Sequence, residues 1–290
     1  MTKPAVALIL AALVSGATRG VRSSGAYDRL GLRRHIAIRP PVVTIVAREY
    51  AFDGPDSIES GPTTFRLVSA GREQHFVGLV RIASPHTFAE YRRTLTSEPA
   101  PAWVIGAGGV GTISPGAVAT TTLDLEPGLY AMVCDMEDAH GTPHIMEGML
   151  RPLTVLPRRN GASMPVPDLK FVLAEFAFLG PAQVRAGSHV MEVRNVGSQP
   201  HMALLWRLLP GKSASTVVHW LDTPSDRSRP PVILVGGVPD LGPGRGAELV
   251  VHLRAGRYLL ICLVNDVHDH KAHYEKGMLK EFAVLPATVR

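Results

Sequence analysis

Hydrophobic and polar residues alternate with a period of two along most of the chain, as in β-strands with one buried face. This pattern predicts strands over residues 42–52, 65–68, 76–82, 120–125, 129–133 and 150–155 in the first part of the sequence. In the second part it predicts strands over residues 171–178, 190–195, 202–208, 247–253, 258–263 and 279–284. Turns containing Gly and Pro separate these segments, and only residues 87–95 and 213–221 have a helical pattern. The sequence therefore predicts an all-β sandwich fold.

The two parts of the sequence repeat one another. Residues 47–52 match residues 173–178 at an offset of 126, and residues 125–134 match residues 253–262 at an offset of 128. A difference of two in the offset needs only a short insertion in a surface loop, which costs little loop entropy. We therefore predict a duplicated domain. The two copies are expected over residues 42–156 and 169–290, joined by a Pro-rich linker over residues 157–168.

Each repeat carries the same set of potential metal ligands. The two cysteines of the chain each end an apolar segment, and each is followed in the next loop by a His-x4-Met motif. With one upstream histidine in each repeat, the two sets are His75, Cys134, His144 and Met149, and His201, Cys262, His273 and Met278. A thiolate and two imidazoles with a weak thioether suit copper in both of its oxidation states. The expected cofactor is copper, with up to one ion per repeat.

A disulfide is the usual alternative for two cysteines outside the cytoplasm. Cys134 and Cys262 occupy equivalent positions in the two repeats, so a disulfide would require the same interior loop of both domains to meet. We predict that the two thiols are not joined.

Three motifs in each repeat together resemble a known family. A histidine follows a strand and turn, a segment with Pro-Gly-x-Tyr or Ala-Gly-x-Tyr leads to the cysteine, and His-x4-Met leads into the last strand. Over nearly its whole length, each repeat resembles the cupredoxins, the blue-copper β-sandwich proteins. The resemblance implies two tandem Greek-key β-sandwiches, with the eight residues above as copper ligands. It also implies one-electron transfer at type 1 copper, with the loop histidine edge as the electron exit.

The repeats depart from this family in their loops. Nine residues separate Cys134 from His144 and ten separate Cys262 from His273, more than in the small electron carriers of the family. The loops also contain other histidines, which are alternative ligands but are expected to be exposed: His140, His268 and His270. Acidic loop residues are expected to be solvated: Asp135, Glu137, Asp138 and Asp266. The residue after the upstream histidine, Phe76 or Met202, is not the asparagine common in the family.

Three classes of function remain open from the sequence. Val133 and Ile261 precede the cysteines, where copper nitrite reductases have a histidine for a second copper, so the chain is not predicted to be an enzyme. It is predicted to be an electron carrier with a redox partner protein of unknown identity. The alternatives are a copper-handling protein, and a copper-free interaction module on the same fold.

The N-terminal region predicts export. Residues 1–17 combine Lys3, a short apolar run and small residues before a cleavage point, as in a secretory signal peptide; a buried N-terminal helix is the alternative. Residues 18–41 form a basic leader: residues 18–48 carry seven arginines against Asp28, a net charge of +6, whereas residues 49–290 have a net charge of −2. A folded basic face is therefore not indicated, and nucleic-acid binding is not expected. We expect a periplasmic or extracellular protein without a membrane-spanning segment.

Overall fold

Alternating burial along the strands follows the period-two pattern of the sequence, because one side of each strand faces the core. In the strand Leu169–Ala174 (β9), for example, Leu169, Phe171 and Leu173 are buried and Lys170 is exposed. The structure is a computed structural model that describes residues 37–97, 100–223 and 229–287. The predicted signal peptide and residues 18–36 of the predicted leader lie outside the described residues.

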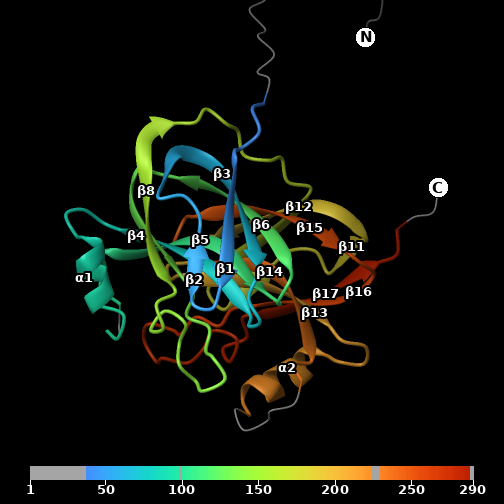
Figure 1. Cartoon of the computed structure of the whole chain (residues 1–290). Coiled ribbons are helices and arrows are strands. Elements are labelled where there is room, and N and C mark those ends of the chain that lie inside the picture. Colours follow the sequence, from blue (N-terminus) through green and yellow to red (C-terminus); the bar gives the residue numbers. More distant parts are fainter. Residues whose placement is uncertain (1–36, 98–99, 224–228, 288–290) are drawn as a thin grey trace, which may run out of the picture. The chain divides into compact units, whose positions relative to one another are not determined.

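The first half of the chain is built almost wholly from strands (Figure 1). Its elements are β1 (Val42–Arg48), β2 (Ala51–Asp53), β3 (Ser57–Ser69), β4 (His75–Ile82), α1 (Phe88–Arg93), β5 (Val104–Ile113), β6 (Val118–Leu125), β7 (Gly128–Val133) and β8 (Leu150–Arg159). The helix α1 begins where predicted, because Thr87 and Glu90 form a capping box that satisfies its first backbone N–H groups.

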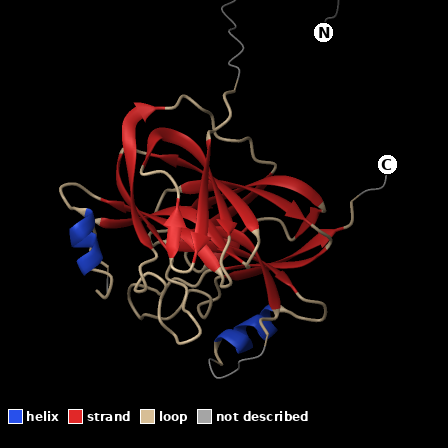
Figure 2. Ribbon diagram, viewed as in Figure 1, coloured by secondary structure: helices blue, strands red, loops and turns tan. Residues whose placement is uncertain are grey.

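The second half repeats this order of elements. After β9 come β10 (Ala177–Leu179), β11 (Gln183–Arg185), β12 (Gly187–Asn195), β13 (His201–Leu208), α2 (Ala214–Leu221), β14 (Val232–Leu241), β15 (Gly246–Leu253), β16 (Gly256–Ile261) and β17 (Leu279–Leu285). Figure 2 shows strands throughout, with both short helices outside the sheets. The predicted all-β fold and the two predicted helices are confirmed.

The strands form two layers, and each layer continues from one half into the other. One layer runs in the order β1, β3, β6, β15, β12 and β9, with β6 paired to β15 across the halves. The other runs β8, β7, β4, β5, β14, β13, β16 and β17, with β5 paired to β14. Each half is thus a β-sandwich, as the resemblance to cupredoxins implies. The pairing across the halves covers edges that would otherwise be open.

Two strands that the sequence pattern missed, β5 and β14, join the halves. Both are rich in glycine, which has low β-propensity and gives no alternation of polar and apolar side chains. Their backbones approach closely: a Cβ added to Gly111 would lie 2.8 Å from the carbonyl carbon of Gly237. One added to Gly106 would lie 2.6 Å from the carbonyl oxygen of Asp240. Glycine therefore marks the backbone contact between the halves.

Two strands predicted as single segments are each divided by a tight turn. Residues 42–52 form β1 and β2, which pair antiparallel with Arg48 opposite Ala51, so Glu49 and Tyr50 make a two-residue turn. Residues 171–178 divide in the same way into β9 and β10, at Glu175 and Phe176. The prediction of continuous strands was wrong here, because neither turn contains the Gly, Pro, Asn or Asp residues by which turns are recognised. Each turn lies beside a predicted metal group.

The core is continuous between the halves. Buried apolar side chains of the first half, such as Phe65 and Leu67, belong to the same cluster as Phe171 and Phe282 of the second half. Strand β8 continues to Arg159 and so includes the start of the predicted linker, and the described residues from Ala37 onward form one compact unit. None of the helices in the described ranges has the length and apolar character needed to cross a membrane.

Candidate metal centres

The first set of predicted ligands converges at the end of two paired strands. His75 is the first residue of β4, Cys134 directly follows β7, and His144 lies in the loop between β7 and β8. Because β4 and β7 are antiparallel neighbours, the start of one lies beside the end of the other. The potential ligand atoms of the three residues lie within 4.8 Å of one another, and all three side chains are buried. Cys134 Sγ lies 3.7 Å from His144 Nδ1.

The second set converges in the same way. His201 begins β13, Cys262 follows β16, and His273 lies in the next loop. These ligand atoms also lie within 4.8 Å of one another, and the side chains are buried. His201 Nδ1 and His273 Nδ1 are 3.0 Å apart, and Cys262 Sγ is 3.4 Å from His273 Nδ1. Two imidazole nitrogens and a thiol therefore face one small volume, and each group could hold a metal ion.

The fourth predicted ligand of each set, Met149 or Met278, is fully buried beside the group. The backbone fixes its place: Cys134 N donates to Met149 O at 3.2 Å, and Met149 N donates to His144 O at 2.9 Å. Met278 makes the same two bonds with Cys262 and His273, at 3.2 and 2.9 Å. Each loop therefore returns its methionine to the cysteine and the histidine.

Several ring nitrogens of the groups lack the hydrogen-bond partners that their burial requires. Among the described residues, His75 Nδ1 and Nε2 and the Nε2 atoms of His144, His201 and His273 are buried without a hydrogen bond. Unsatisfied buried nitrogens are costly, and four histidines in two repeated clusters are hard to explain by packing alone. A metal ion that accepts imidazole and thiolate ligands would relieve this cost, so the residues fit a soft-metal site.

Burial sets the protonation states of these ligands in the metal-free protein. It raises the pKa of the Cys134 and Cys262 thiols to about 12. It lowers the pKa of His75, and with the neighbouring His273 it lowers that of His201 to about 4. The imidazoles of these two residues are therefore neutral and able to bind metal, whereas binding at the cysteines must displace a proton.

Backbone N–H groups near each cysteine sulfur partly offset the rise in thiol pKa that burial causes. Met202 N donates to Cys262 Sγ at 3.2 Å, and backbone N–H groups of Phe76 and Met136 lower the pKa of Cys134. Phe76 and Met202 occupy the position of the family's asparagine. Their side chains cannot form its hydrogen bonds, but their backbones contact the cysteine sulfur.

A carboxylate from the two-residue turn lies beside the upstream histidine of each centre. Glu49 accepts backbone hydrogen bonds from Arg72 and Glu73, and its Oε1 lies 3.7 Å from His75 Nε2. Glu175 accepts bonds from the backbone and hydroxyl of Ser198, and its charge favours protonation of His201. The carboxylates are thus held in place by the loop that precedes each histidine.

An aromatic ring from the same turn covers each loop histidine. The ring of Tyr50 lies 4.8 Å from that of His144, and the ring of Phe176 lies 5.2 Å from that of His273. Both imidazoles are fully buried, whereas Tyr50 and Phe176 are partly exposed. The edges of His144 and His273, predicted as the electron exit, are therefore not at the surface but lie behind these two rings.

The other loop residues take no part in either group. His140, His268 and His270 are exposed, as expected. Asp266 was predicted to be solvated but is only 1% exposed, because it accepts backbone hydrogen bonds and pairs with Lys276. That ion pair and the backbone N–H of His268 hold the pKa of Asp266 well below its ordinary value.

Sequence reasoning missed the residues around the ligands. The turns at residues 49–50 and 175–176 lie within the first matched segment of the repeat, so the repeat contained a signal for them. Glu73 had no such signal: its Oε2 lies 2.9 Å from His144 Nε2, and the equivalent residue in the second repeat is Gln199.

No protein-family model and no curated protein matches the chain. Among solved structures, it is similar to reduced auracyanin from Roseiflexus castenholzii, at 20% identity and a TM-score of 0.30, over 41% of this chain and 99% of that one. It is also similar to the copper-containing nitrite reductase of Thermus scotoductus, at 15% identity and a TM-score of 0.24, over 86% of this chain and 62% of that one. A third is the blue copper oxidase of Nitrosomonas europaea, at 16% identity and a TM-score of 0.25, over 86% of both chains.

Proposed function

We propose that this chain binds copper in both halves and transfers single electrons at these two sites. One observation carries the proposal: two buried imidazoles and a buried thiol converge beside a buried methionine, and this arrangement occurs twice. Zinc also accepts Cys and His, but a thioether is a soft ligand that favours copper. Calcium and magnesium prefer oxygen ligands, and none belongs to either group.

The protein residues would have distinct roles. His75, Cys134 and His144 would bind copper in the first half, and His201, Cys262 and His273 in the second, with Met149 and Met278 as weak fourth ligands. Copper held by such ligands exchanges one electron between its two oxidation states. The paired strands that carry the ligands are held by backbone hydrogen bonds, so the site is rigid before copper binds. Tyr50 and Phe176 lie next to the buried imidazoles and are the proposed routes for electrons to the surface.

Electron transfer is tested by the rate at which the copper-loaded protein exchanges electrons with a small inorganic oxidant. A carrier should be reoxidised rapidly, with loss and return of its visible absorption in stopped-flow measurements. The Cys134→Ser and Cys262→Ser variants measure each site separately, because each should retain the other half's copper. A bound copper ion that exchanges electrons slowly at both sites would contradict the proposal.

We propose a carrier and not an enzyme. The residues before the cysteines, Val133 and Ile261, cannot ligate a second copper ion next to the first. Similar structures include an auracyanin, a copper-containing nitrite reductase and a blue copper oxidase, so catalytic activity must be measured directly. The copper-loaded protein should show no catalytic nitrite reduction and no oxygen-dependent oxidation of phenols. Turnover in either assay would contradict this part of the proposal.

Copper handling is the second candidate, and the exposed loop histidines favour it. His140, His268 and His270 lie in the loops that carry the ligands, where they could capture or release an ion. A handling protein should transfer its copper to a competing chelator much faster than a carrier does. Replacing the three exposed histidines with asparagine should slow that transfer only if handling is the function.

Export and a redox partner protein are also part of the proposal. Residues 1–17 support export, because they have the pattern of a secretory signal peptide. The intact mass of the protein from its native host should be lower than that of the full chain by the mass of about 17 N-terminal residues. A full-length cytoplasmic product would exclude export. If the protein is exported, crosslinking in a periplasmic or extracellular fraction would identify the redox partner protein.

A further inference from the structure

A small cavity lies where the first metal centre meets the second half. Its volume is about 170 Å³. From the first half it is lined by Gln74, Thr112 and Met136, and from the second half mainly by apolar side chains with Trp206 and Trp220. Among the residues that the structure describes, none that lines the cavity carries a charge. The cavity thus favours a neutral occupant.

The two tryptophans leave hydrogen-bond donors unsatisfied. Among the described residues, the Nε1 atoms of Trp206 and Trp220 are buried and have no hydrogen-bond partner. Trp206 is only 5% exposed. A buried N–H group without an acceptor costs stability, and buried tryptophans usually find one. Two such donors beside one cavity indicate that a molecule with an acceptor oxygen would be bound there.

The volume limits the size of that molecule. An engineered apolar protein cavity of about 150 Å³ binds benzene. The cavity at Trp206 and Trp220 is slightly larger, so it has room for one six-membered ring with a small substituent. We propose that this cavity binds a neutral single-ring aromatic compound whose carbonyl oxygen accepts a hydrogen bond from an indole N–H. No metal ligand lines the cavity, so binding does not require copper.

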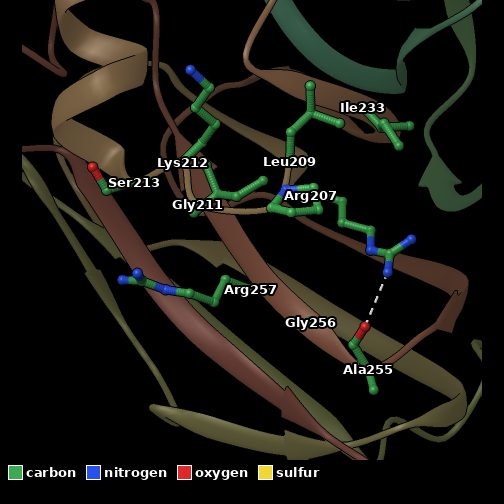
Figure 3. A pocket seen from close by; sticks show the side chains of 11 residues that line it. Arg207, Leu209, Gly211, Lys212, Ser213, Ile233, Ala255, Gly256 and Arg257 are labelled. Atoms are coloured by element: carbon green, nitrogen blue, oxygen red, sulfur yellow. Dashed lines mark hydrogen bonds between the residues drawn. The ribbon is translucent and has the colours of Figure 1, made fainter.

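Other cavities are less suitable. A cavity of about 530 Å³ in the second half is lined by Arg207, Lys212 and Arg257, which would suggest an anion site. Figure 3 shows that these three side chains point in different directions. Arg207 also donates to the carbonyl of Ala255, and Arg257 pairs with Glu281. The cations are therefore not arranged around one ligand.

The cavity lies close to the first centre, because two residues that line it are near the ligands in the sequence. Gln74 immediately precedes His75, and Met136 lies two residues after Cys134. Thr112 Oγ1 also lies 3.9 Å from Met136 Sδ. A ligand should therefore shift the visible spectrum of the first centre. This spectral shift requires bound copper and so rests on the proposed function, whereas binding of the compound to the metal-free chain does not.

Acetophenone and toluene test the proposal, because they share a ring but only acetophenone has an acceptor oxygen. Calorimetry on the metal-free full chain should show saturable binding of one acetophenone. Toluene should bind about threefold to tenfold more weakly, the range expected for one hydrogen bond. Tryptophan fluorescence should follow the same titration.

Two variants and a control locate the site. Trp206→Phe and Trp220→Phe keep an aromatic ring but remove the N–H, so at least one of them should weaken acetophenone binding by about threefold to tenfold and leave toluene binding unchanged. Leu234→Phe should fill the cavity and weaken binding of both compounds. Trp103→Phe is the matched control, because Trp103 stacks on His86 and does not line the cavity. Absence of saturable acetophenone binding would overturn the proposal, as would equal binding by both tryptophan variants and the wild type.

Discussion

His144 Nε2 lies 2.9 Å from Glu73 Oε2 in the first metal centre, although the two atoms are not aligned as a hydrogen bond. In the second centre the equivalent residue is Gln199, whose side-chain oxygen accepts a hydrogen bond from the backbone of Val267. The two ligand groups therefore have the same residue types but different charges around them. Since a negative charge stabilises the more positive oxidation state of a nearby metal, the two centres should differ in reduction potential.

Replacing Glu73 with glutamine should raise the reduction potential of the first centre. The substitution keeps the size of the side chain and removes the negative charge beside His144, so the oxidised copper loses stabilisation. Spectroelectrochemistry in a Cys262→Ser background would measure the first centre alone. Glu126→Gln, at an exposed carboxylate outside the ligand groups, is the control. An unchanged or lower potential in Glu73→Gln would show that this contact does not tune the site.

Both cysteines are free in the structure, which confirms that they do not pair. Because burial raises the pKa of both thiols to about 12, few thiolates exist at pH 8 in the folded, metal-free protein. Alkylation should therefore be slow in the folded state and should reach two thiols per chain after unfolding. Mass spectrometry of the alkylated chain would count them. Rapid labelling of folded protein at both cysteines would show that the thiols are not buried as they are in the structure.

Gly109 and Gly237 occupy equivalent positions in strands β5 and β14, and both have positive φ angles. A Cβ at Gly109 would collide with the carbonyl oxygen of Val77, and one at Gly237 with that of Ala203. Gly109→Ala and Gly237→Ala should each lower the free energy of unfolding by about 2–4 kcal/mol, through backbone strain and overpacking.

Urea unfolding of the metal-free variants would test this cost. Gly54→Ala is the matched control, because the nearest atom to an added Cβ there is at an ordinary contact distance of 3.5 Å. If the control and the two variants unfold at the same urea concentration, the close backbone approach in the structure is wrong.

The sequence predicted which residues converge in each group, because each group is carried by a motif that is repeated. The convergence of His75 with Cys134 follows from two antiparallel strands, and the apolar alternation that marks those strands is visible in the sequence. Strands β5 and β14 were not predictable in this way, since their glycines are selected by a backbone contact between distant segments. The contact of Glu73 with His144 was equally hidden, because it depends on how the loop before β4 folds.

Glu248 should make folding stability depend on pH. Its side chain is 8% exposed, and burial, with the nearby charge of Glu192, raises its pKa to about 7 from an ordinary value of 4.5. The folded protein therefore holds a proton that the unfolded chain has released between these pH values, so stability is lost as the pH rises through this window. Relative to Glu248→Gln, the wild type should lose on the order of 2 kcal/mol between pH 4.5 and pH 8.

Urea unfolding at both pH values, on metal-free protein, measures this difference. A difference between wild type and Glu248→Gln that stays constant with pH would mean that Glu248 has an ordinary pKa in the folded protein.

Copper titration followed by visible spectroscopy tests most directly whether both ligand groups are copper sites. The wild type should bind two copper ions per chain and develop intense visible absorption, because the thiolate of Cys134 or Cys262 is bound to each ion. Serine is a hard, barely ionised ligand, so Cys134→Ser and Cys262→Ser should each remove the colour of one half only. A wild-type protein that stays colourless after reconstitution with copper would contradict this account, and the copper-free interaction module would replace it.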